Sequence, residues 1–125
     1  MADPVIPTNS ILYSIKHKLG PEIVEQFFET DIITYVNMSL GRLNQLGVGT
    51  EGFLINGMNE TWDQFEPLYP KIPEIDTFAY LKCKQLFDPS ANATISATIE
   101  KQIAELTWLI EVKIRQLKED LDESD

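Results

Sequence analysis

The chain has 125 residues, of which 43% are hydrophobic and 24% are charged, so it is long enough to bury one hydrophobic core and a second domain is not expected. Ten basic residues against twenty acidic ones give a formal net charge of -10, which disfavours sequence-specific DNA binding because phosphate contacts need clustered lysines and arginines. No apolar stretch approaches the roughly 20 residues that cross a bilayer. The first residues also lack the charged and apolar segments of a signal peptide, so a cytosolic chain is expected.

The first part of the chain predicts an extended arm followed by a helix. Residues 1–9 contain two prolines and show no periodicity, which is typical of an arm. A helix is predicted over 11–19, where Asn9 or Ser10 caps its first turn and the following Gly-Pro pair stops it. Its buried face is expected to hold Leu12, Ile15 and Leu19.

Two further helices are predicted in the middle of the chain. One begins at Thr30 or Asp31 and ends before the glycines at 47 and 49. Its predicted apolar positions are Ile33, Val36, Leu40 and Leu43. The other begins at Pro73 and ends before Asp88-Pro89. Its predicted buried side consists of Ile75, Phe78, Ala79, Cys83 and Leu86.

A long connection separates these two helices, from Val48 to Pro73. Several glycines and prolines interrupt its pattern, and connections of this length tend to be functional. Residues 53–55 precede the turn pair Asn56-Gly57 and are consistent with half of a short hairpin. The segment 61–64 has the spacing of a capping box, which favours one short helical turn that Trp62 opens and staples to the loop.

The longest predicted helix runs from about Thr94 to Leu121. One apolar stripe with spacings of three and four residues follows it: Ile95, Ile99, Ile103, Leu106, Ile110, Ile114, Leu117 and Leu121. This stripe spans roughly 39 Å at the α-helical rise. A compact domain of this length is only about 35 Å across. The helix is therefore expected to extend beyond the rest of its own fold.

The distal end of this stripe is expected to lack a partner within the chain. Its four aliphatic side chains, Ile110, Ile114, Leu117 and Leu121, would each lose about 1.5 to 3 kcal/mol if they stayed in water, so another surface should cover them. Truncation after Leu109 is accordingly expected to leave the domain folded. The alternative is that the helix bends or ends near Val112 and that the remainder frays.

Basic residues lie between the distal aliphatics, and they allow two interpretations. Lys113, Arg115 and Lys118 make this segment locally basic, which would suit an acidic groove on a partner. They are also compatible with ordinary solvated positions whose stems cover apolar neighbours. The last seven residues carry five acids, which should fray the helix end because negative charge there opposes the helix dipole.

The residues that carry enzyme chemistry are sparse. His17 is the one histidine and Cys83 the one cysteine, and one of each cannot build a zinc site. A catalytic triad would have to combine His17 with Ser14 or Cys83, but Ser14 lies three residues earlier on the same predicted helix without a nucleophile elbow, so His17 is interpreted as a half-exposed helical residue. Cys83 is expected to act as a small apolar residue on a helix, and Trp108 to lie in the core or at its seam. No catalytic residue, metal ligand or cofactor site is predicted.

These elements predict an all-α fold: a small four-helix domain with a long C-terminal helix and a long loop between its second and third helices. We expect an arm at 1–9, a helical domain at 10–110, and a helix extension with an acidic tail at 111–125.

Five segments together resemble a known family. They are ILYSIKHKLG (11–20), TDIITYVN (30–37), LNQLGVG (43–49), TFAYLKCKQLFDP (77–89) and IAELTW (103–108). Their order is similar to that of the head-tail connector (adaptor) proteins of tailed bacteriophages, and the likeness covers about residues 10 to 110. The chain departs from the pattern in having one proline, Pro89, at the later turn, and in continuing to Asp125 after the Glu-Leu-x-Trp segment.

The resemblance implies a virion structural protein made in the cytoplasm of the host bacterium. Such a subunit assembles as a homo-oligomeric ring, commonly of twelve copies, beneath the portal protein. The ring extends the DNA channel and offers a platform to the next neck or tail-completion protein. DNA would pass through the lumen without specific binding, which the net acidity favours, and no membrane is involved.

On this resemblance, two groups of residues are expected to form contacts. The portal interface is predicted at Ile110, Ile114, Arg115, Leu117 and Leu121. The loop surface that faces the channel or a neighbouring component is predicted at Phe53, Leu54, Ile55 and Trp62. The alternative function is a small helical phage assembly chaperone or regulator, which would hold a partner helix in the groove left by the same stripe.

Overall fold

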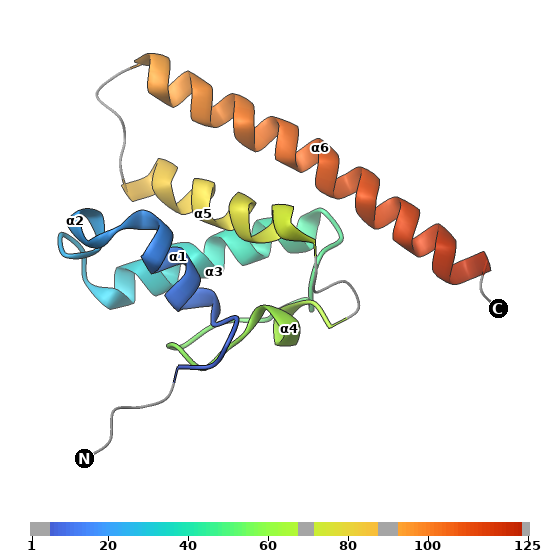
Figure 1. Ribbon diagram of the computed structural model, residues 1–125, viewed down its shortest axis with the longest axis horizontal. Coiled ribbons are helices and arrows are strands. Elements are labelled where there is room, and N and C mark those ends of the chain that lie inside the picture. Colours follow the sequence, from blue (N-terminus) through green and yellow to red (C-terminus); the bar gives the residue numbers. More distant parts are fainter. Residues whose placement is uncertain (1–5, 68–71, 88–92, 124–125) are drawn as a thin grey trace.

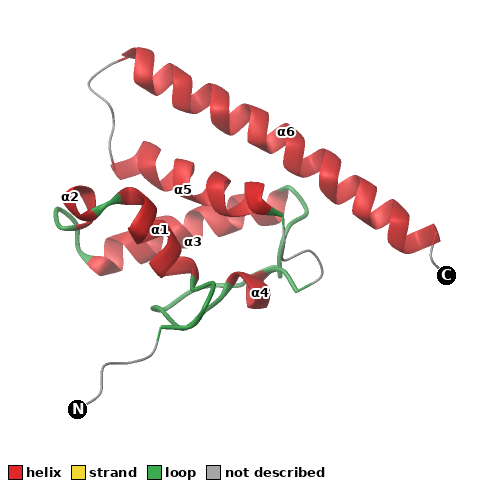
Figure 2. Ribbon diagram, in the orientation of Figure 1, coloured by secondary structure: helices red, strands yellow, loops and turns green. Residues whose placement is uncertain are grey.

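The computed structural model describes residues 6–67, 72–87 and 93–123, and of these Ala93 and 121–123 by their backbone alone. Within these ranges the chain forms helices and no strand, which confirms the all-α prediction (Figures 1 and 2). The helices are α1 (Ile11–Leu19), α2 (Pro21–Val24), α3 (Glu29–Gln45), α4 (Trp62–Phe65), α5 (Pro73–Phe87) and α6 (Ala93–Glu123). Most of the arm predicted at 1–9 lies outside the described residues.

Helix α1 begins and ends as its sequence predicts. Ser10 is the cap, because its side-chain oxygen accepts a hydrogen bond from the backbone N–H of Tyr13 at 3.3 Å. Asn9 instead adopts a left-handed conformation with φ of 67°, and its amide donates to Asp63. The three predicted apolar residues of α1 are buried, and Ile11 joins them.

The Gly-Pro pair after α1 stops one helix and starts another. Gly20 ends α1 with a positive φ of 88°, and Pro21 then occupies the first position of the four-residue helix α2. Proline suits this position because its fixed φ is helical and the missing N–H would have no partner there. Pro21 is therefore the sequence signal for the start of α2, but the Gly-Pro pair was interpreted only as the end of the preceding helix.

The connection between α3 and α5 contains the predicted capping box but not the predicted hairpin. Thr61 and Gln64 exchange hydrogen bonds between side chain and backbone, which fixes α4. Residues 53–55 pair with no strand in the described part of the chain. Instead the Asn37 amide of α3 donates to the carbonyl of Ile55 at 3.1 Å and accepts from its N–H at 2.8 Å. The Asn37 side chain thus makes the two hydrogen bonds to the backbone of Ile55 that the second strand of a hairpin would have made.

Helix α5 lies at the centre of the fold and contacts α1, α3 and α6. Because it is covered on several sides, its buried residues exceed one stripe and include Leu81 and Phe87. Phe87 packs against Phe27 and Tyr35, with ring centroids 4.5 and 4.7 Å away. The prediction that Leu86 is buried was wrong: its side chain is exposed, because it points to the surface between α3 and α5.

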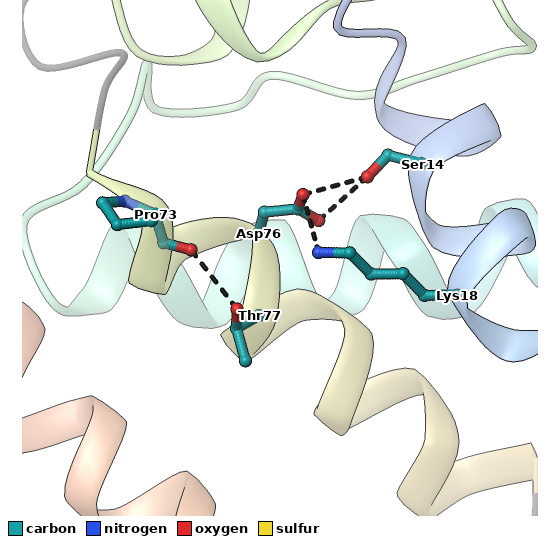
Figure 3. Close-up of polar contacts among 5 residues, drawn as sticks. All are labelled: Ser14, Lys18, Pro73, Asp76 and Thr77. Atoms are coloured by element: carbon teal, nitrogen blue, oxygen red, sulfur yellow. Dashed lines mark hydrogen bonds and ion pairs between the residues drawn. The ribbon is translucent and has the colours of Figure 1, made fainter.

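A polar contact also joins α1 to the first turns of α5 (Figure 3). The hydroxyl of Ser14 donates to the Asp76 carboxylate, with both oxygens at 3.0 Å, and the ammonium of Lys18 lies 2.8 Å from the same group. On α5 itself, the hydroxyl of Thr77 donates to the carbonyl of Pro73 at 3.4 Å. This contact fixes the angle between α1 and α5 at a half-buried position.

Helix α6 lies beside α5 and runs in the opposite direction, so that its second half passes the beginning of α5 (Figure 1). It continues to the turn that follows α3. An added Cβ on Gly47 in that turn would lie 3.7 Å from Ile114 Cγ2 and 3.5 Å from Lys118 Nζ. The single continuous helix to Glu123 agrees with the predicted length, and the alternative of an end near Val112 is excluded.

Candidate interaction surface

From Ile99 to Leu117 the apolar stripe of α6 packs against its own chain, so the expectation that Ile110 and Ile114 lack a partner within the chain was wrong. Ile110 and Ile114 have exposed fractions of 0% and 3%, and Leu117 packs against the same core. The covering surfaces are α5 and the turn around Gly47. Among the described side chains of the stripe, Ile95 at its beginning is half exposed. Ile110 and Ile114 therefore present no surface to another protein in this conformation.

A charged contact fixes the same part of α6 to α5. The ammonium of Lys113 forms an ion pair and hydrogen bond with Glu74, in the first turn of α5. This hydrogen bond holds the pKa of the Glu74 carboxyl below its ordinary value, against the opposing effect of desolvation. Of the three basic residues predicted to face a partner, Lys113 is thus bound within the chain, whereas Arg115 and Lys118 are exposed.

The remaining residues of the predicted portal interface differ in accessibility. Arg115 is exposed and Leu117 is half buried. Leu121 belongs to α6, but the structure describes only its backbone. The groove that the chaperone alternative requires is filled, because α5 and the Gly47 turn occupy it.

The predicted loop surface also divides into buried and exposed residues. Ile55 and Trp62 belong to the core, and Phe53 is half buried with its ring 5.6 Å from that of the buried Phe65. Leu54 is 61% exposed. The alternation follows from the hydrogen bonds of Ile55 to α3, which turn this residue inward and its neighbour outward. Leu54 is the residue of this group that a neighbour would meet.

A second face of α6 points away from the body of the protein, and its centre is Trp108. This tryptophan is 63% exposed, which is unusual for so large an apolar side chain and contradicts the expected core or seam position. At 100° per residue it lies about 160° around the helix from the buried Ile110. We define the outward face as the residues that lie within about 40° of Trp108 around the helix and no more than seven residues from it along the chain. They are Lys101, Ala104, Val112 and Arg115 together with Trp108.

The outward face combines an apolar centre with basic ends. Lys101 and Arg115 lie seven residues before and after Trp108, and Leu109 widens the apolar area at its side. A shallow hollow bounded by Lys101, Ala104, Glu105, Trp108 and Leu109 marks this area. An exposed aromatic residue between two cations is well suited to bind an apolar partner surface with acidic edges. The sequence signal for this outward face was the angular position of Trp108, which lies opposite the apolar stripe of α6 and not beside it.

Two observations concern the residue types that hold metal ions or carry catalysis. His17 is exposed and stacks on Tyr13, with ring centroids 5.9 Å apart. In the part of the chain that the structure describes, no three histidine, cysteine or acidic side chains are placed to hold a metal ion. In the same part, no helix has the length and apolarity that a membrane span requires.

The lone cysteine is expected to be chemically inert in the folded protein. Burial raises the pKa of the Cys83 thiol to about 12, an effect that outweighs the hydrogen bond with Ser39. Since the thiolate is the reactive form, alkylation at about pH 8 should be at least 100-fold slower in the folded chain than in urea. Mass spectrometry after iodoacetamide treatment measures this ratio, and equal rates in both states would contradict the buried position.

Comparison with known protein families identifies a match. A family model described as phage connector protein matches residues 11–116. No curated protein and no solved structure matches the chain. The matched range includes α1 to α5 and most of α6, with the outward face and the loop around Leu54.

Proposed function

The chain belongs to the phage connector protein family, and on this basis we propose that it is a head-tail adaptor subunit that forms a ring beneath the portal. The family makes the chain a structural component of the virion that associates with other proteins of the head and tail. In the proposed role, the ring extends the DNA channel of the portal and connects the capsid to the neck and tail.

The observation that carries the proposal is the pair of opposite faces on α6. One face is fixed to the body by Ile110, Ile114 and the Lys113–Glu74 ion pair, so the helix is held as a rigid rod. The other face presents Trp108 to the outside. A rod whose inner face is already satisfied can bind another protein with its outer face without any cost of refolding.

We assign the portal contact to this outward face. Arg115 keeps the role that the sequence predicted for it, because it lies on the outward face within about 20° of Trp108. Ile110 and Ile114 do not touch the portal in this proposal. They pack in the core and hold α6 against the body of the protein. Leu54, on the loop that precedes α4, is assigned to the next neck or tail-completion protein.

The charge of the chain supports a channel role rather than a DNA-binding role. At a formal charge of -10 per copy, a ring of such subunits would repel the phosphate backbone at short range, and DNA would pass without adhering. The proposed subunit number is twelve, as is common for adaptors of this kind.

The test is a binding assay with the portal protein of the same phage. Replacement of Trp108 by Glu is expected to weaken binding to portal rings about 30-fold or more, since an exposed tryptophan at the centre of an interface typically contributes at least about 2 kcal/mol. The thermal unfolding curve should not change, because the side chain makes little contact with its own core.

The matched control is Ile95→Glu, which introduces the same charge at an exposed apolar residue of the same helix away from the outward face. This control is expected to bind portal rings normally. Normal binding by the Trp108 variant, or an equal loss in both variants, would refute the assignment of the portal contact to this face.

A further inference from the structure

A shallow groove between α3 and α5 has a composition unlike the rest of this acidic protein. Its lining residues are Met38, Ser39 and Arg42 from α3, and Lys82, Gln85 and Leu86 from α5. Met38 is 56% exposed and Leu86 44% exposed, although both are large apolar side chains. The groove therefore has an apolar centre that no described residue covers.

The two helices that form the groove carry positive charge on this stretch. From Ile32 to Gln45 of α3 and from Thr77 to Phe87 of α5 there is no acidic residue, although the whole chain has twenty. The bases in these stretches are Arg42, Lys82 and Lys84. Arg42 donates to the neutral Gln45, Lys84 lies over the ring of Tyr80, and the described residues offer Lys82 no ion-pair partner. A partner for this groove would be acidic with an apolar side chain.

The end of α6 has the complementary composition. Its last residues are Glu119, Asp120, Leu121, Asp122 and Glu123, a leucine between pairs of acids. Glu119 and Asp120 are exposed, and the helix end lies beyond the body of the protein in Figure 1. The last described contacts of α6 with the body are made by Ile114, Leu117 and Lys118. Four acids at a helix C-terminus are unfavourable for the helix dipole, so a basic partner would relieve this repulsion.

The end of α6 cannot occupy the groove of its own chain. Helices α5 and α6 are antiparallel, so Lys113 of α6 already meets Glu74 at the beginning of α5, and the following residues move farther past that end. Leu86 lies twelve residues along α5 from Glu74, or about 18 Å in the opposite direction. The matching partner for the groove must therefore come from a different molecule.

We propose that the acidic end of α6, residues 119–123, docks in the α3–α5 groove of a second copy of this chain. Because donor and acceptor surfaces differ, each copy offers one of each, and the contact is of the head-to-tail kind, which forms a ring when the rotation between neighbouring copies closes. This inference rests on the proposed adaptor function and deepens it, since it names the lateral contact of the ring. Its docking segment begins four residues after Arg115, the last residue of the outward face around Trp108.

Disulfide trapping between two variants of the full chain tests the contact. One variant carries Asp120→Cys and the other carries Gln85→Cys, and the two are mixed in equal amounts under mild oxidation. A mixed dimer that links position 120 to position 85 is expected, identified by mass spectrometry of the joined peptides. As the matched control, Glu22→Cys replaces Gln85→Cys, because Glu22 is exposed and lies on α2, which contributes no residue to the lining of the groove. The proposal fails if the 120–85 dimer is no more abundant than the 120–22 dimer.

Charge reversal makes the test specific for the proposed pairing. Adding Arg42→Glu and Lys82→Glu to the Gln85→Cys variant should lower the yield of the 120–85 dimer about tenfold, because acids would then face acids. Adding Glu119→Lys to the Asp120→Cys partner should recover most of this loss. A loss without recovery would show that the groove variants act in some other way, and it would overturn the pairing.

The portal assay separates this inference from the proposed function. If the 120–85 dimer does not form while the chain still binds portal rings through Trp108, the groove proposal is wrong and the adaptor role stands. If the dimer forms but portal rings are not bound, the contact between copies stands and the adaptor role is wrong. The groove could instead bind an acidic segment of a different neck protein. In that case no 120–85 dimer would form, and the charge-reversal variants would no longer bind that neck protein. This result would also refute the proposal.

Discussion

Truncation after Leu109 is expected to unfold the chain or to destabilise it severely. The two isoleucines removed at 110 and 114 are buried, and their burial contributes about 3 to 6 kcal/mol together. Their loss would also expose the facing sides of α5 and the Gly47 turn, and it would leave the Glu74 carboxylate without Lys113. A domain of this size has a total stability of about 5 to 15 kcal/mol. Urea unfolding followed by circular dichroism measures the effect.

A shorter truncation provides the control. Removal of residues 119–125 takes away the acidic end and leaves Ile114, Leu117 and Lys118 in place. The free energy of unfolding should then change by less than about 0.5 kcal/mol, because no described core contact is lost. A chain ending at Leu109 that unfolds with the stability of the full protein would show that α6 detaches from the body in solution.

Replacement of Gly49 by Ala is expected to destabilise the fold by about 2 to 5 kcal/mol, the sum of backbone strain and overpacking. The backbone at Gly49 has a positive φ of 82°, which disfavours any side chain. An added Cβ would collide with Cζ of the Phe65 ring. Phe65 is fully buried against Phe53 and Trp62, so its ring cannot move aside.

Gly52 offers a closely matched control for this substitution. Its φ of 81° is nearly the same as that of Gly49, but no heavy atom lies within 4 Å of an added Cβ. Gly52→Ala should therefore cost only the backbone strain, about 1 to 2 kcal/mol. The difference between the two midpoints in urea isolates the collision with Phe65, and equal destabilisation would mean that the ring does yield.

The sequence predicted the long helices because their information is local. Caps, prolines and periodic apolar residues set the bounds of α1 and α5, and α3 begins one residue before the predicted Thr30. The burial of Leu86 was predicted wrongly because one apolar stripe was assumed, whereas α5 has neighbours on several sides. How many neighbours a helix has is a property of the tertiary arrangement, which local periodicity does not contain.

The interface residues were harder to predict than the helices. The stripe and its length were read correctly, but a comparison of helix length with domain diameter ignores the direction in which the helix crosses the body. Because α6 crosses α5 and reaches the turn after α3, Ile110 and Ile114 find partners inside the chain. Trp108 would have been identified as outward-facing by its angle from Ile110 alone, which is a local property.

The contact between Asn37 and Ile55 has a geometric consequence for any assembly built from this chain. Asn37 and Met38 are consecutive residues of α3, so the loop that carries Leu54 and the groove that contains Met38 are attached to the same turn of one rigid helix. Copies joined through the groove would therefore hold their Leu54 loops at one common height and with even spacing. The Leu54 loops would then form a ring of identical contact sites, and a partner with the same rotational symmetry could bind all of them at once.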